Sequence, residues 1–244
     1  AKTVQQPHGG YLPLSRFAHH TLEDGFCLKA AENIPASIMG QTVDYMSRLV
    51  AGLEVPEHAF QVSLFGAMMA GCPHRGAELL SQIHGLDDAS LSAACKLSSY
   101  DAYFRSPNMK AVHPVEPGPN HNTLFNIRLM ITRMVRFLSE YGPVIESGFT
   151  MEGGYTDIVS SGDGDFLTED TLWDVKTSKF PPKSSDTLQV LMYYIMGKHS
   201  WNDCFQTIQN IGIMNPRLNQ IWLLNTNMIP AAVIQNVKKD VIGY

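Results

Sequence analysis

The chain has 244 residues, of which 44% are hydrophobic and 17% charged, and its formal net charge is -5 at pH 7. This composition is typical of a globular protein with a full core, organised as one large domain or two small ones. The acidic balance excludes a protein coated with positive charge for general nucleic-acid binding, but a nucleic-acid enzyme can confine its basic residues to one cleft.

The sequence contains no apolar run of the roughly 18 residues that a membrane-spanning helix needs, and residues 1–16 lack the apolar centre of a signal peptide. We therefore expect a cytoplasmic protein without a membrane partner. The four cysteines, Cys27, Cys72, Cys95 and Cys204, form no CxxC pair. They are expected to be buried free thiols rather than a disulfide or metal framework.

The first half of the chain is predicted to be helical. Apolar residues recur at helical spacing in three stretches, namely residues 34–53, 59–70 and 77–83. A further helix begins near Asp88, which we expect to cap it, and continues through Ala93. Four prolines then fall within residues 106–122, so this stretch is predicted to be a loop or linker.

The second half alternates between helix and strand. Its clearest helix covers residues 123–142 and ends at Gly142-Pro143. Short strands are predicted in four stretches, namely 144–150, 155–160, 165–167 and 171–177. A helix over 187–197, strands over 210–214 and 220–224, and a last helix opened by Pro230 follow. The predicted organisation is an α/β core over residues 121–244 and a mostly helical N-terminal region over residues 1–120.

The predicted strand over 171–177 carries an acid and a base on one face. Side chains two residues apart on a strand point the same way, so Asp174 and Lys176 project together while Val175 points into the core. With a turn at 168–170, Asp165 on the preceding strand lies opposite this pair. Two carboxylates and an ammonium group then converge on one small volume.

Such a cluster suits metal-assisted hydrolysis of a phosphodiester. Two adjacent carboxylates raise each other's pKa unless a cation lies between them. Mg²⁺ binds to one or two carboxylates and keeps water and phosphate oxygens as its other ligands. The ion activates a bound water, and a neighbouring lysine orients that water or stabilises charge in the transition state.

Two simpler interpretations compete with this one. An Asp-x-Lys tripeptide alone is typical of a solvated surface hairpin, whose ion pair contributes about 0–1 kcal/mol to stability. Asp163, Asp165 and Asp174 also fall at three positions of an EF-hand calcium loop. However, Leu167 and Thr168 occupy positions where that loop needs an oxygen ligand and a glycine.

The helix predicted over 187–197 favours the catalytic interpretation. Gln189 and Tyr193 are four residues apart and share one face of this helix. Residues 162–193 thus contain Gly-x-x-Asp, a strand ending in Asp-x-Lys-Thr, and a helix with Gln-x-x-x-Tyr. This pattern resembles the PD-(D/E)XK nuclease superfamily, and more closely its RecB and lambda-exonuclease-like branch.

The resemblance covers about residues 123–244 and implies a restriction-endonuclease-like mixed sheet flanked by helices. It implies that Asp165 and Asp174 bind Mg²⁺ or Mn²⁺ and that Lys176 is the catalytic lysine. Gln189 and Tyr193 would line the active site, and DNA is the implied substrate. The acid of the Asp-x-Lys-Thr strand is Asp174, whereas many members of the superfamily have glutamate at this position.

Members of this branch usually have one more acid or histidine as a third metal ligand. The candidates here are Glu140, Glu146, Glu152 and His121, and their spacing along the sequence does not choose among them. Some members hold an iron–sulfur cluster, but only Cys204 follows the tyrosine here, so no cluster is expected. Endonuclease and exonuclease activity are not distinguished by the sequence.

Other features leave further alternatives open. Two groups of basic side chains are candidates for phosphate contacts or for solvated surface charges. Lys179, Lys183 and Lys198 flank the proposed site, and Arg128, Arg133 and Arg136 lie on the helix predicted over 123–142. The aromatic residues form no ladder suited to stacking single-stranded bases. The N-terminal region could grip substrate, cover the site or form a homo-oligomer. An alternative function is a non-catalytic module that keeps the nuclease scaffold to bind nucleic acid or protein.

Overall fold

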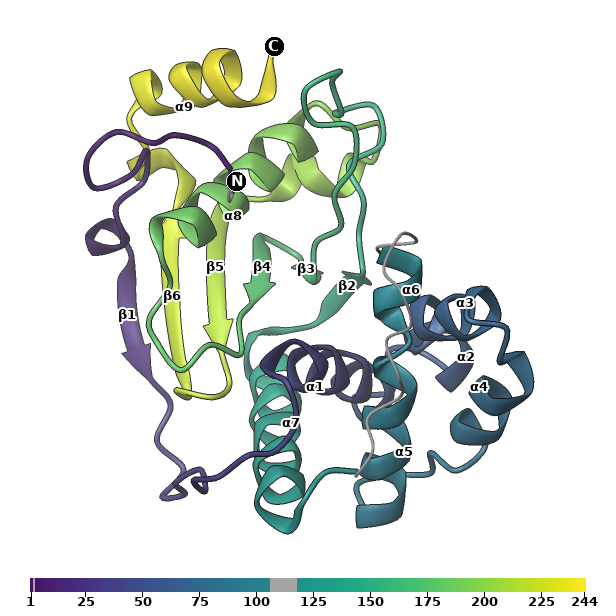
Figure 1. The fold of residues 1–244 in the computed structure, drawn as a ribbon. Helices are drawn as coiled ribbons and strands as arrows, with labels where there is room; N and C mark the ends of the chain where they lie inside the picture. The colour runs from purple at the N-terminus through teal and green to yellow at the C-terminus, as the bar shows by residue number, and fades with distance from the viewer. Residues whose placement is uncertain (2, 106–117) are drawn as a thin grey trace. The chain divides into compact units, whose positions relative to one another are not determined.

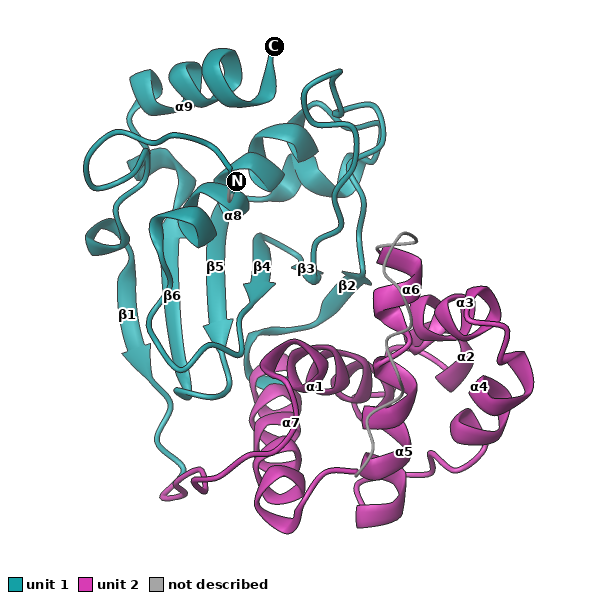
Figure 2. Ribbon diagram, viewed as in Figure 1, with its two compact units in different colours: residues 1–24, 139–244 teal, residues 25–138 magenta. Residues whose placement is uncertain are grey.

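The structure is a computed structural model, which describes residues 1, 3–105 and 118–244 (Figure 1). The chain divides into two compact units (Figure 2). Residues 1–24 and 139–244 form one, here called the sheet unit, and residues 25–138 form the other, the helical unit. This division differs from the boundary expected at residue 120, because residues 1–24 join the C-terminal part and residues 121–138 belong to the helical unit.

The helical unit contains the predicted helices, with some changes at their ends. Its elements are α1 (Ala36–Val50), α2 (Pro56–Ala59), α3 (Gln61–Met69), α4 (Pro73–Leu80), α5 (Asp88–Ser98), α6 (Asp101–Arg105) and most of α7 (His121–Tyr141). The cap of α5 is Asp87 rather than Asp88, since the Asp87 side chain accepts a hydrogen bond from the Ser90 N–H at 3.0 Å. The predicted linker over 106–122 falls mainly outside the described residues.

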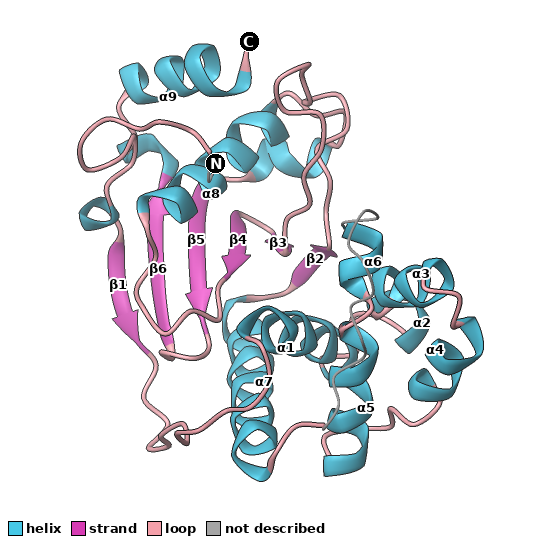
Figure 3. Cartoon of the chain, in the orientation of Figure 1, coloured by secondary structure: helices cyan, strands magenta, loops and turns pink. Residues whose placement is uncertain are grey.

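The sheet unit is built on a six-stranded mixed sheet in the order β1-β6-β5-β4-β3-β2 (Figure 3). The strands are β1 (Ala18–Thr21), β2 (Val144–Ser147), β3 (Phe166–Thr168), β4 (Thr171–Val175), β5 (Asn210–Asn215) and β6 (Gln220–Asn225). β4 and β5 are parallel, whereas the other neighbouring strands are antiparallel. Helix α8 (Ser184–Lys198) connects the parallel pair, and α9 (Ala231–Val237) follows β6. The α/β prediction is confirmed at this level.

One predicted strand is absent from residues 155–160, and one strand of the sheet was not predicted. Residues 155–160 form a bend and irregular backbone rather than a strand, and the Tyr155 hydroxyl donates to the Gly162 carbonyl oxygen at 2.5 Å instead. β1 was missed because all four of its residues are exposed, so its sequence carries no buried alternation. This strand is stabilised by pairing with β6, where the His19 ring stacks on Trp222.

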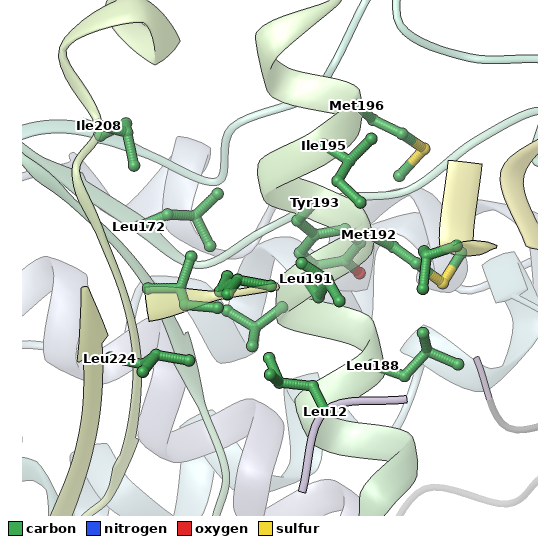
Figure 4. Packing of buried hydrophobic residues seen from close by; sticks show 14 of the residues in the cluster. Leu12, Leu172, Leu188, Leu191, Met192, Tyr193, Ile195, Met196, Ile208 and Leu224 are labelled. Carbon is green, nitrogen blue, oxygen red and sulfur yellow. The ribbon is translucent and has the colours of Figure 1, made fainter. Parts of the chain in front are cut away.

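Helix α8 packs on one face of the sheet, over β4 and β5 (Figure 1). Leu188, Leu191 and Ile195 of the helix are buried in the same apolar cluster as Leu172 of β4 (Figure 4). Because side chains alternate along a strand, Asp174 projects from the same face as Leu172. The core packing that fixes α8 therefore also sets the helix beside Asp174.

The opposite face of β4 carries Trp173. This side chain is 2% exposed, and its ring meets that of Tyr141 edge to face at a centroid distance of 5.5 Å. On the next strand Gly212 lies in register with Trp173, and a Cβ at this glycine would overlap the indole ring. Glycine is thus needed at this position so that the large ring can lie across β5.

Among the described residues, none of the helices combines the length and the hydropathy needed to span a bilayer. The four cysteines are free, as expected. Their predicted burial was wrong for Cys27 and Cys72, which are exposed, and only Cys95 is fully buried.

We expect Gly212→Ala to destabilise the sheet unit by about 1–3 kcal/mol, because the added methyl must displace the buried Trp173 ring. Urea unfolding followed by tryptophan fluorescence would measure the change. Gly162→Ala is the control in the same unit, since a Cβ there meets Met151 and Tyr193 at an ordinary contact distance of 3.4 Å. Equal stability of the two variants would contradict this account of Trp173 packing.

Candidate active site

The β3–β4 hairpin brings two acidic residues to the same place. Phe166 pairs with Trp173 and Leu167 with Leu172, so continuing the register by one step sets Asp165 opposite Asp174. The Asp165 carboxylate accepts a hydrogen bond from the Val175 N–H, at 2.5 Å from nitrogen to Oδ2. Asp165 is therefore held against the end of β4, beside Asp174.

Asp174 and Lys176 form a largely buried ion pair. The Lys176 Nζ donates a hydrogen bond to Oδ1 of Asp174 at 2.8 Å and lies 2.6 Å from Oδ2. The Asp174 side chain is 3% exposed and the Lys176 side chain 24%. The intervening Val175, which alternates with Asp174 along the strand, is half-buried.

Lys176 is also bound to helix α8. Its Nζ donates to Oε1 of Gln189 at 3.0 Å, and Nε2 of Gln189 donates to the Tyr193 hydroxyl at 2.7 Å. The four-residue spacing of the last two side chains brings them together on one face of α8. A continuous polar chain thus runs from Asp174 through Lys176 and Gln189 to Tyr193.

The protonation of these groups is strongly perturbed. Burial raises the pKa of Asp174 to about 7, although the Lys176 ammonium opposes the shift. At Lys176 burial lowers the pKa, but the charges of Asp174 and Asp165 outweigh it and the net pKa lies above its ordinary value. As at Asp174, burial raises the pKa of Tyr193 to about 12.

The donor set suits a divalent ion with few protein ligands. Oδ2 of Asp174 is buried and accepts no hydrogen bond from the described residues, although the ammonium nitrogen is close. Asp165 adds a second carboxylate across the hairpin. Mg²⁺ often binds proteins through one or two carboxylates and retains several waters. Asp165 and Asp174 therefore fit the role of metal ligands.

The part of the chain that the structure describes brings no third acidic, histidine or cysteine ligand to this pair. Among the residues that the structure describes, no group of three or more His, Cys, Asp or Glu side chains could hold a metal ion. Glu146 Oε2 instead accepts a hydrogen bond from Asn202, at 2.8 Å, while Glu140 and Glu152 are exposed. His121 belongs to the helical unit.

The structure adds residues that the sequence analysis did not select. The charge of Asp186 contributes to the raised pKa of Lys176, and its Oδ2 accepts from the Lys183 N–H at 2.8 Å. An acid at the third position of a helix is a capping signal, so the sequence contained an indication that Asp186 lies at the start of α8. A cavity of about 340 Å³ lies beside the polar chain, with Gln189 and Tyr193 among its lining residues.

Two of the arginines considered for phosphate contacts serve the helical unit itself. The Arg133 side chain is buried and donates to the Phe26 carbonyl oxygen at 2.8 Å. Arg128 donates to the Leu86 carbonyl oxygen at 2.7 Å and pairs with Asp88. Both arginines therefore hold the fold of that unit.

Comparison of the chain with protein-family models, curated proteins and solved structures found no match. The resemblance to PD-(D/E)XK nucleases consequently depends on the chain's own residues and on their geometry.

We expect Lys176→Met to lower the free energy of unfolding by on the order of 3 kcal/mol at about pH 8, because it leaves Asp174 buried without a counter-ion. The loss of unfolding free energy should be smaller at about pH 5. At that pH the Asp174 carboxyl, whose pKa is already raised by burial, takes up a proton in the folded state. Chemical unfolding in EDTA at both pH values measures the change.

Two further variants act as controls for this prediction. Lys183→Met removes an exposed lysine, so it should have little effect at either pH. Asp174→Asn combined with Lys176→Met removes both charges and should recover most of the loss. An equal loss for the two single lysine variants would show that the ion pair does not control stability.

Proposed function

We propose that the chain is a metal-dependent nuclease of the PD-(D/E)XK type, which hydrolyses DNA phosphodiester bonds and has a restriction-endonuclease-like core. A cytoplasmic location is part of this proposal. Its main support is the polar chain in which Lys176 donates both to Asp174 and to Gln189, with Asp165 held opposite. These residues were selected from the sequence alone, and they come from a hairpin and a separate helix.

Asp165 and Asp174 would hold Mg²⁺ or Mn²⁺, which when bound lowers the pKa of a water ligand and polarises a phosphoryl oxygen. Lys176 presents a positive charge beside this position, and its Nζ contacts both carboxylate oxygens of Asp174 and Oε1 of Gln189. The ammonium charge is suited to orient a water or to stabilise a phosphate oxygen as negative charge develops.

Gln189 and Tyr193 act in this scheme as positioning residues. Gln189 accepts from Lys176 and donates to Tyr193, so it fixes the direction of the ammonium group. The Tyr193 hydroxyl oxygen accepts a hydrogen bond from the Gln189 side-chain amide, and its own O–H is left as a donor. Burial raises the pKa of Tyr193 further above neutral pH, so this hydroxyl acts as a donor and not as a phenolate.

The test is cleavage of linear, closed circular and single-stranded DNA in Mg²⁺ or Mn²⁺. We expect Asp165→Asn, Asp174→Asn and Lys176→Gln each to lower the rate by about 100-fold or more, because each removes a ligand or the stabilising charge. Gln189→Ala and Tyr193→Phe should lower it by about 10- to 100-fold, as expected for residues that orient others. Cutting of closed circles would identify an endonuclease.

Asp203→Asn is the matched control, because it neutralises an exposed carboxylate in the same unit and should retain full activity. EDTA should abolish cleavage by the unaltered protein. If the folded protein binds DNA but cuts neither DNA nor RNA with either ion, the nuclease proposal fails. The chain would then be a binding module on the same scaffold.

A further inference from the structure

The segment that joins β4 to α8, residues 176–183, is here called the 176–183 loop (Figure 1). Two side chains from β5 and the turn after it fasten its first half. Asn215 Nδ2 donates to the Ser178 carbonyl oxygen at 2.9 Å, and Arg217 Nε donates to that of Thr177 at 2.8 Å. Both donors are themselves buried. The loop is therefore firmly attached to the sheet close to Lys176.

The second half of the loop is fixed as well. The Phe180 N–H donates to the Ser178 hydroxyl at 3.0 Å, and the Lys183 N–H donates to Asp186 at the start of α8. Pro181 restricts the backbone, and Pro182 is buried. A loop held in this way has little conformational freedom left to lose when it binds a partner.

This anchored loop presents an aromatic ring to solvent. The Phe180 side chain is 67% exposed, and the lysines on either side of it, Lys179 and Lys183, are exposed as well. Four residues span at most about 14 Å, so Phe180 lies within that distance of Lys176. An isolated exposed phenylalanine is common on protein surfaces. An exposed ring between two lysines, on an anchored loop beside the candidate active site, is a more specific arrangement.

We propose that the 176–183 loop binds a single strand of DNA next to the active site, with Phe180 stacking on a base and Lys179 and Lys183 contacting backbone phosphates. This inference rests on the proposed nuclease function and specifies its substrate. Stacking on a side chain requires the face of a base, which neighbouring base pairs cover inside a duplex but which a single strand leaves accessible. The positive charges of the two lysines complement the phosphates of that strand.

The experiment measures binding without cleavage, by fluorescence anisotropy of labelled oligonucleotides in EDTA. We expect Phe180→Ala to weaken binding of a single strand roughly tenfold, because one base-stacking contact is lost. Phe180→Trp should keep the affinity. An abasic oligonucleotide with the same phosphates should bind equally to the unaltered protein and to Phe180→Ala.

The lysine contribution is read from salt dependence. Lys179→Gln and Lys183→Gln should each reduce the slope of log affinity against log salt by about 0.7, the value for one phosphate contact on a single strand. Trp201→Ala is the matched aromatic control, since Trp201 is 83% exposed in the same unit but outside the loop. This variant should bind like the unaltered protein.

Several results would overturn the loop proposal. Phe180→Ala could bind a single strand as tightly as the unaltered protein, or lose as much affinity for the abasic strand as for the normal one. It could also lose affinity for blunt duplex alone. Finally, the unaltered protein could fail to bind single strands. The nuclease proposal is judged separately, by cleavage in Mg²⁺ or Mn²⁺. Binding that depends on Phe180 without any cleavage would support the loop assignment and reject the nuclease.

Discussion

The arrangement of the candidate site depends on one buried ion pair, between Asp174 and Lys176 at the end of β4. Burying a carboxylate is costly, and here an ammonium group two residues away on the same strand face compensates part of that cost. The raised pKa of Asp174 shows that the compensation is incomplete. Every other feature of the site, from the Asp165 carboxylate to the amide of Gln189, is placed around this pair.

Local periodicity was enough to predict the parts of the site that lie close together in sequence. Strand alternation put Asp174 and Lys176 on one face, and the hairpin register set Asp165 opposite, because both follow from backbone geometry alone. The helical repeat likewise put Gln189 and Tyr193 together. That the strand and the helix meet at Lys176 was inferred from the family resemblance. In the structure, the packing of α8 on Leu172 supplies the physical reason.

Features that depend on distant pairing left no local signal. β1 is entirely exposed, so nothing in its own residues indicated a strand, and only its ladder with β6 explains it. The sequence also did not indicate that residues 1–24 belong to the sheet unit, because they join it through β1. Asn215 and Arg217 hold a loop about forty residues earlier in the chain, which spacing along the sequence does not reveal.

The energetics of the polar chain argue for a role beyond stability. A buried ion pair is often no more stable than apolar side chains of similar volume, so stability alone gives little reason to keep Asp174 and Lys176 inside the unit. The chain nevertheless keeps this pair and continues it through Gln189 to Tyr193. Groups with perturbed protonation that converge in this way are typical of functional sites. The cost in stability therefore supports the proposal that this site binds a charged ligand.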